Sequence, residues 1–156
     1  MYIKILKCIV AISLCLAAGF LGSFFTSPSI PTWYQFLAKP SFSPPNWLFA
    51  PVWTALYILM GISLYLVWGS KSKKRQIAIN IFLIQLGLNA LWSIIFFGMK
   101  NPGLALLEIV ILWSTIFLTI KLFFPISRIA AYLLVPYILW VSFASILNLS
   151  IWLINK

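Results

Sequence analysis

The sequence is short of charge. Only 8% of its 156 residues are charged, whereas an ordinary soluble domain has about 25%. In contrast, 63% of the residues are hydrophobic and the mean hydropathy is +1.09. So few charged side chains could not cover the surface of a water-soluble fold, so the composition indicates a membrane protein. A membrane-spanning helix needs roughly 20 apolar residues, which leaves room for about five spans and excludes a folded extramembrane domain.

Histidine is absent and Glu108 is the single acid. Paired-carboxylate catalysis, Ser-His-Asp triads, and zinc or haem ligation through histidine therefore lack their parts, and we expect no metal site. Cys8 and Cys15 lie about two helical turns apart in one apolar run, too far for a disulfide. The eleven basic residues lie between apolar runs, where membrane topology explains them, so no nucleic-acid partner is expected.

Five apolar runs predict an all-α membrane protein, a bundle of five transmembrane helices forming one integral membrane domain over residues 1–156. The spans are expected at roughly 5–25, 47–69, 76–98, 103–124 and 129–153. The first run is too long for the core of a signal peptide and has no clear cleavage site, so we interpret it as a mature helix.

Turn residues separate these runs. Asn46 is expected to cap the second span, and Asn101-Pro102-Gly103 to turn the third span into the fourth. Pro136 lies inside the fifth span, where it should kink the helix. Glu108 is interpreted as a residue of a helix N-terminus, where the helix dipole favours a negative charge.

The basic residues also predict an orientation. Eight of them lie at the ends of the spans on the side of the N-terminus, and three lie on the other side. The positive-inside rule therefore places the N-terminus in the cytoplasm and the C-terminus outside. The segment from about residue 26 to 46 then lies on the outer face of a cell membrane. The Lys71–Arg75 cluster is a topology anchor or, alternatively, a site for anionic lipid.

Aromatic and amide side chains recur at helical spacing within three spans. Trp53 and Tyr57 share a face of the second, and Asn89 and Trp92 share a stripe of the third. The fifth span repeats the pattern at steps of four, with Pro136, Trp140, Ala144 and Asn148. Either asparagine alone could bond between helices as structural glue. The convergence of amide, indole and phenol groups favours a shared pocket near the outer half of the bundle.

The outer loop between the first two spans is rich in proline and aromatic residues. Residues 33–45 read WYQFLAKPSFSPP. Because proline restricts the backbone, such a loop is stiff. It is interpreted as a lid over a cavity or, alternatively, as a segment that packs on the bilayer surface.

These residues resemble a known family. The outer-loop block reads Trp33-Tyr34-x-x-Leu37-x-Lys39-Pro40-Ser41-Phe42-x-Pro44-Pro45-x-Trp47-x-Phe49-x-Pro51-Val52-Trp53-Thr54-x-Leu56-Tyr57-x-x-Met60-Gly61. Two further blocks are Asn89-x-x-Trp92-Ser93-x-x-Phe96-Phe97-Gly98 and Pro136-Tyr137-x-x-Trp140-x-x-Phe143-Ala144-x-x-Leu147-Asn148. Over its whole length the chain resembles the translocator proteins, also called tryptophan-rich sensory proteins or peripheral benzodiazepine receptors.

The resemblance implies a five-helix bundle, in a bacterial cell membrane here, that binds protoporphyrin IX or a related tetrapyrrole beneath the first loop. It also implies binding of isoquinoline carboxamide and benzodiazepine-type drugs. The porphyrin is expected as ligand or substrate, with no resident cofactor. A sterol site is doubtful, since no basic residue follows Tyr137 until Lys156. The binding residues it implies are Tyr34, Phe42, Pro44, Trp53, Tyr57, Asn89, Trp92, Trp140, Phe143, Ala144 and Asn148.

Three functions follow as hypotheses. The leading one is light-dependent porphyrin degradation, with Trp53 and Trp140 as redox partners of the excited ring, although no conventional catalytic constellation is present. The alternatives are a porphyrin transporter and a stress sensor without catalysis. The sequence offers no titratable relay for proton coupling, since Glu108 is its only acid. Ala18-x-x-x-Gly22 is either a homodimer face or a contact within the bundle.

Overall fold

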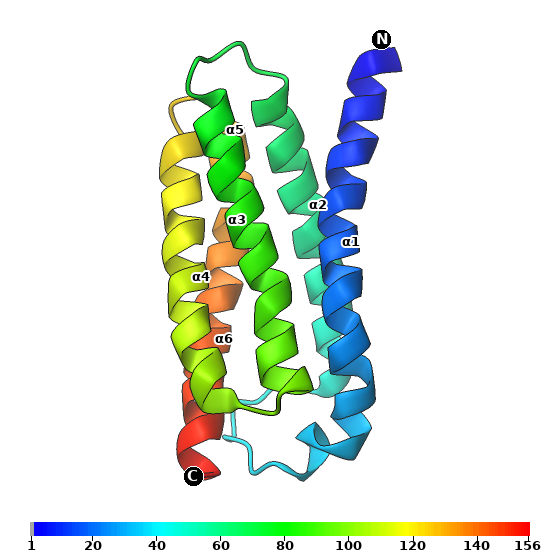
Figure 1. The fold of residues 1–156 in the computed structure, drawn as a ribbon, viewed down its shortest axis with the longest axis vertical. Helices are drawn as coiled ribbons and strands as arrows, with labels where there is room; N and C mark the ends of the chain where they lie inside the picture. Colours follow the sequence, from blue (N-terminus) through cyan, green and yellow to red (C-terminus); the bar gives the residue numbers. More distant parts are fainter. Residues whose placement is uncertain (1) are drawn as a thin grey trace.

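The protein is a bundle of long helices that run side by side, described by a computed structural model over residues 2–156 (Figure 1). The chain termini lie at opposite ends of the bundle (Figure 1). The helices are α1 (Tyr2–Thr32), α2 (Phe49–Trp68), α3 (Arg75–Ser93), α4 (Pro102–Phe123), α5 (Arg128–Leu133) and α6 (Val135–Ile154). Short turns of helix add η1 (Tyr34–Phe36), η2 (Asn46–Leu48) and the π-helical η3 (Ile94–Gly98).

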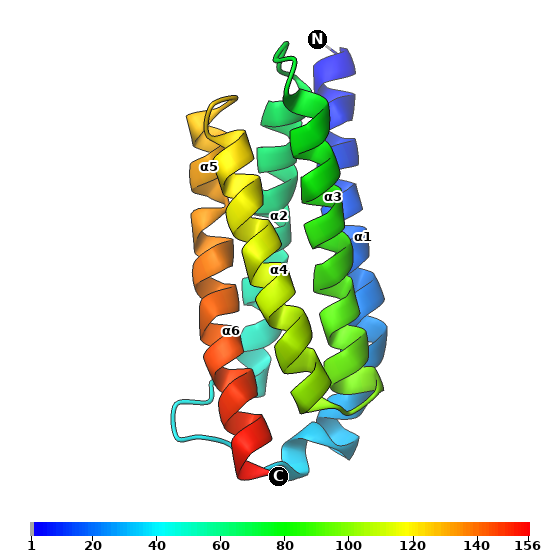
Figure 2. The ribbon, with the colours of Figure 1, turned by 60° about the vertical axis from the view of Figure 1, so that its left-hand side comes forward.

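Five helical segments are long and apolar enough to cross a membrane, which confirms the predicted five-helix bundle. They cover Tyr2–Thr32, Asn46–Trp68, Arg75–Gly98, Pro102–Phe123 and Arg128–Ile154. Successive spans are antiparallel because their links are short, as a second view of the bundle shows (Figure 2). The side chains buried between the helices form an apolar core, as the hydrophobic composition of the sequence predicts.

The first helix extends beyond its expected end at residue 25. It continues to Thr32 with Pro28 and Pro31 inside it. Each proline removes one backbone donor, so the carbonyls of Phe24 and Ser27 lose the donors at positions 28 and 31. The hydroxyl groups at this end of α1 bond to other carbonyls of the helix. Thr32 Oγ1, for example, donates to the Pro28 carbonyl at 2.6 Å. Ser29 Oγ donates across to the Phe97 carbonyl at 2.9 Å, which fastens this last turn of α1 to η3.

The fifth span is broken where Pro136 predicts a distortion. It divides at Leu134 into α5 and α6. A proline at this position cannot donate to the carbonyl four residues earlier, so the helical ladder is interrupted there. The buried backbone beside the break is held from another helix, because Ser63 Oγ of α2 donates to the Ala130 carbonyl at 2.7 Å.

The turns give a mixed outcome. Asn101 caps α4 as the turn motif suggests, accepting from the Leu104 backbone N–H at 3.0 Å, and Pro102 begins that helix. The expected cap by Asn46 is wrong. Asn46 begins η2, and the N-terminus of α2 has no side-chain cap. A turn of 3₁₀-helix already leads the chain into α2, so the helix start needs no separate cap.

Glu108 does not lie at a helix N-terminus, so its interpretation as a dipole-stabilised terminal residue is wrong. The first turn of α4 contains no acidic residue, and Glu108 is buried deeper in the span, 6% exposed. It shares its buried face with Ala105, Ile109 and Leu112. The apolar periodicity of α4, rather than the dipole at its end, decides where this side chain points.

Small residues bring α1 against its neighbours. A Cβ on Gly61 of α2 would come within 2.5 Å of the Ile12 Cα of α1. Gly19 faces the ring of Tyr57, and Gly22 faces Ser93 of α3. Ala18 packs on the main core, so the Ala18-x-x-x-Gly22 stripe serves contacts within one bundle. Homodimerisation stays a prediction, and its interface would have to lie elsewhere than on this stripe.

Replacing Gly61 with alanine should destabilise the bundle by about 1–3 kcal/mol, because the added methyl group must push α1 away from α2. The thermal midpoint of detergent-solubilised protein measures the effect. Gly87→Ala is the matched control, since nothing lies within 4 Å of its Cβ position and alanine favours a helix by about 1 kcal/mol. Equal midpoints for the two variants would contradict the close approach.

Candidate ligand-binding cavity

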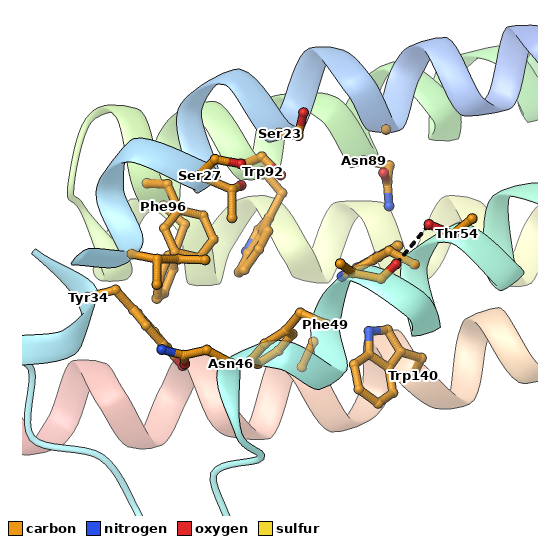
Figure 3. A pocket seen from close by; sticks show the side chains of 18 of the residues that line it. Ser23, Ser27, Tyr34, Asn46, Phe49, Thr54, Asn89, Trp92, Phe96 and Trp140 are labelled. Carbon is orange, nitrogen blue, oxygen red and sulfur yellow. Dashed lines mark hydrogen bonds between the residues drawn. The ribbon is translucent and has the colours of Figure 1, made fainter. Parts of the chain in front are cut away.

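The half of the bundle next to the outer loop contains a cavity of about 410 Å³ (Figure 3). This volume is in the range of small-molecule sites, about 300–1,000 Å³. Helices α1, α2, α3 and α6 form its walls together with η1, η2 and η3, and α4 contributes none of the described lining residues. The fold therefore places the cavity on one side of the bundle, with α4 behind α3 and α6.

Aromatic rings form flat surfaces on several walls. Trp53 stacks on Tyr57 with ring centres 5.6 Å apart and planes 29° apart. Trp92 stacks on Phe96 at 4.9 Å and 23°. Trp140 lies on α6 opposite these residues, against Phe49 at 6.2 Å (Figure 3). Such surfaces suit a broad, planar, largely apolar ligand.

A chain of hydrogen bonds closes the inner end of the cavity. The Tyr57 hydroxyl donates to Asn89 Oδ1. Asn89 Nδ2 donates to the Tyr137 oxygen at 3.1 Å, and the Tyr137 hydroxyl donates to Gln85 Oε1 at 2.9 Å. These four side chains come from α2, α3 and α6 and are all buried. They bond three helices together at the depth where Tyr57 and Asn89 meet the cavity.

A second amide links the cavity to α4. Trp92 Nε1 donates to Asn148 Oδ1 at 3.1 Å, and Asn148 Nδ2 donates to the Pro102 carbonyl at 2.8 Å. The sequence left open whether the asparagines bond between helices or line a pocket. Asn89 and Asn148 do both, since each makes interhelical bonds and each lines the cavity.

The tryptophans of the cavity differ in their hydrogen bonding. Trp92 has its indole N–H engaged with Asn148. Within residues 2–156, the indole N–H groups of Trp53 and Trp140 donate to no protein acceptor, and both rings line the cavity. These two indoles are therefore available to a ligand as ring faces and as donors.

The outer loop is held against the end of the bundle. Ala38 N–H donates to Asn155 Oδ1 at 3.0 Å, and Asn155 Nδ2 donates back to the Ala38 carbonyl at 2.9 Å. Tyr34 is buried, its ring 5.6 Å from that of Phe97 and beneath the Lys39 ammonium at 4.7 Å. Burial raises the pKa of the Tyr34 hydroxyl, so it is neutral at physiological pH.

The structure brings most of the predicted site residues together. Lining the cavity are Tyr34, Trp53, Tyr57, Asn89, Trp92, Trp140, Ala144 and Asn148. Phe42, Pro44 and Phe143 do not line it. Phe42 and Phe143 pack on each other at 6.3 Å, and Phe143 supports Trp140 at 5.6 Å. Pro44 lies in the loop just before η2.

Sequence reasoning missed the contribution of α1. Gly19, Phe20, Ser23, Thr26 and Ser27 all line the cavity. The missed signal is a group of small and hydroxyl residues in an otherwise apolar span. Several of the hydroxyl groups are occupied by carbonyls of their own helix; Thr26 Oγ1, for example, donates to Gly22 at 3.1 Å. Asn46, Ala50 and Thr54 were also missed, although they fall on the helical face of Trp53 and Tyr57.

These features define a five-helix integral membrane protein with an aromatic cavity beneath its first loop. The model of the TspO/MBR family matches residues 11–153. The tryptophan-rich proteins TspO of Archaeoglobus fulgidus and Chlorobaculum tepidum are 48% and 49% identical, over 97% of this chain and 99% and 98% of theirs. The human translocator protein is 38% identical over 85% of this chain and 80% of its own. The chain belongs to the TspO/MBR family.

Asn155→Ala should release the outer loop from α6, because it removes both hydrogen bonds to Ala38. Two such bonds contribute about 1–3 kcal/mol. Hydrogen exchange at the Ala38 amide should therefore become faster. Asn155→Asp keeps an acceptor for that amide and loses the donor to the carbonyl, so it should give an intermediate rate. An Ala38 exchange rate unchanged in Asn155→Ala would contradict this role of Asn155.

Proposed function

We propose that this protein binds a tetrapyrrole of the protoporphyrin IX type in the aromatic cavity. The observation that carries the proposal is the arrangement of flat rings from α2, α3 and α6 around one mainly apolar cavity. A porphyrin is a broad apolar ring with anionic propionates, so indole and phenol faces can stack on it. Lys39 lies at the loop end of the cavity, where its ammonium can meet a propionate.

The binding residues proposed are the predicted set that lines the cavity, with Phe143 packed behind Trp140 and Phe42 packed on Phe143. Because the chain has no histidine, the ring bound is the free base or a metalloporphyrin whose metal takes no histidine ligand. The same cavity takes isoquinoline carboxamide or benzodiazepine-type ligands. Their carbonyl can accept from the Trp53 indole or from the second N–H of Asn89.

Light-driven breakdown of the bound porphyrin is the activity we propose. The excited ring takes an electron from the indole of Trp53 or Trp140, which leaves a reduced porphyrin and an oxidised tryptophan. Both indoles line the cavity with ring faces and N–H groups available, which supports this assignment. The porphyrin is then a substrate rather than a resident cofactor.

A second candidate function is passage of the porphyrin through the membrane, or sensing of its presence, without chemistry. The exposed lining residues favour it, since Phe20 on α1 and Thr54 on α2 both reach the outside of the bundle. A cavity with such a side opening can exchange a ligand with the bilayer. Porphyrin that binds stably under light without bleaching would favour this alternative.

We also propose a bacterial cell membrane as the location, with the N-terminus in the cytoplasm and the C-terminus outside. The excess of basic residues on the N-terminal side supports it, eight against three. The outer loop and the loop end of the cavity then face away from the cytoplasm.

Trp53→Phe and Trp140→Phe should each slow light-driven loss of protoporphyrin while changing its binding free energy by less than about 1 kcal/mol. Phenylalanine keeps a stacking face but is harder to oxidise than indole and has no N–H. Absorbance of the porphyrin in purified protein under illumination measures the rate, and fluorescence quenching in the dark measures affinity.

Trp68→Phe and Trp152→Phe are the controls for that experiment. Neither ring lines the cavity, and each lies beneath a lysine, Lys7 at 5.3 Å and Lys156 at 4.4 Å. Their bleaching rates should match the unmodified protein. If all four variants slow the reaction alike, or none does, the two-tryptophan assignment is wrong.

A thiol placed at Ser41 should react with an impermeant maleimide in intact cells, and one placed at Ser72 should be protected until the cells are opened. The two positions lie in loops at opposite ends of the bundle, and the background should lack Cys8 and Cys15. The reverse labelling pattern would overturn the orientation.

A further inference from the structure

Glu108 is a carboxyl group without a partner inside a membrane-spanning segment. It is buried, and neither of its oxygens has a hydrogen-bond partner among residues 2–156. It is also the only acid in the chain. A charged carboxylate in such a place is costly, and an ionisable residue within a membrane generally marks a functional site.

The charges that could neutralise Glu108 lie elsewhere. The elements packed against α4 are α3, α5, α6 and η3. Their titratable side chains are Arg75, Arg128, Tyr132 and Tyr137. Arg75 begins α3 and Arg128 begins α5, both at the far end of α4 from Glu108, where Lys121 also lies (Figure 1). Tyr132 and the turn residue Lys100 are exposed.

Tyr137 is the one buried titratable group on the elements that pack against α4. Tyr137 is also the centre of the hydrogen-bond chain at the inner end of the cavity. The hydrogen bonds of that chain all point one way, from Tyr57 through Asn89 and Tyr137 to Gln85.

The end of this chain carries a second unpartnered polar group. Gln85 is 1% exposed, and its Nε2 has no acceptor among the described residues. The interior therefore holds a donor and a carboxyl group with unmet hydrogen bonds, on the two helices α3 and α4 that pack on Tyr137. Buried polar groups that are left unpaired in this way point to a bound proton or water.

We propose that Glu108 is a proton-binding site in the membrane interior, coupled by direct electrostatic repulsion to the charge of an anionic ligand in the cavity. The carboxylate takes a proton from solvent when an anionic ligand binds and returns it when the ligand leaves. The coupling rests on the proposed function, because it needs an anionic ligand; the proton site does not.

The size of the coupling follows from Coulomb's law. A ligand carboxylate and an ionised Glu108 about 10–15 Å apart, at an effective dielectric of about 20, repel enough to weaken binding roughly sixfold to sixteenfold. Because linkage is reciprocal, the ligand favours the protonated carboxyl by the same factor. An anionic ligand should therefore bind more tightly at low pH, where Glu108 is protonated.

The test compares protoporphyrin IX with its dimethyl ester, whose propionates are uncharged, in unmodified protein and in Glu108→Gln. Affinities are measured by fluorescence quenching from about pH 5 to pH 9. The unmodified protein should lose roughly sixfold to sixteenfold in protoporphyrin affinity, relative to Glu108→Gln, as pH rises. The ester should show no such difference. Titration of the propionates themselves contributes equally to both proteins and cancels in the comparison.

Two further measurements test the proton site and do not require Glu108→Gln to bind porphyrin. Infrared spectroscopy of ligand-free protein should show the C=O stretch of a protonated carboxylic acid that Glu108→Gln lacks. Since Glu108 is the only side-chain carboxyl in the chain, the band has no other side-chain source. Calorimetry in two buffers of different ionisation enthalpy should show proton uptake when protoporphyrin binds the unmodified protein.

The outcomes separate the two proposals. Absence of the acid band at every pH would overturn the proton site whether or not porphyrin binds. Equal pH dependence in the unmodified protein and Glu108→Gln would overturn the coupling while leaving porphyrin binding intact. Absence of any porphyrin binding would overturn the proposed function and with it the coupling, and the acid band alone would still decide the proton site.

Discussion

The need to satisfy buried polar groups without water governs this structure more than any other constraint. In a bilayer each backbone amide must find a partner within the protein, so the spans are helices, and any break in a helix must be repaired. Ser63 does this at the break between α5 and α6. The asparagines of α3 and α6 extend the same principle to the contacts between helices.

The cavity is a product of that constraint. The bonds made by Asn89 and Asn148 fix the relative positions of α2, α3, α4 and α6, so the aromatic faces between them are held in place before any ligand arrives. A site whose walls are fixed by interhelical hydrogen bonds loses little entropy on binding. Asn89 and Asn148 therefore have both a structural and a binding role. A substitution of either residue would disturb the packing of the helices as well as the cavity.

Much of this arrangement was predictable from the sequence, and the exceptions have physical causes. Apolar runs fix the five spans, and helical spacing brings seven of the predicted residues to one cavity, to which the family resemblance adds Tyr34. Phe42 and Phe143 depend on how the loop folds back, which no helical periodicity describes. The end of α1 was not predictable because prolines usually stop helices, and here Ser29 bonds the last turn to the Phe97 carbonyl of η3. Glu108 was misplaced because the sequence shows its distance along the helix and not what surrounds it.

Because Asn155 contacts Ala38, the two ends of the chain differ in how suitable they are for attaching a tag. Asn155 is the residue before the last of the chain, and it touches the loop beside the cavity. The N-terminus projects from the opposite end of the bundle (Figure 1). A fluorescent protein or affinity tag joined directly after Lys156 is attached one residue away from Asn155, which holds the loop. The same tag on the N-terminus is carried at the far end of the molecule, so that is where a label intended to be silent belongs.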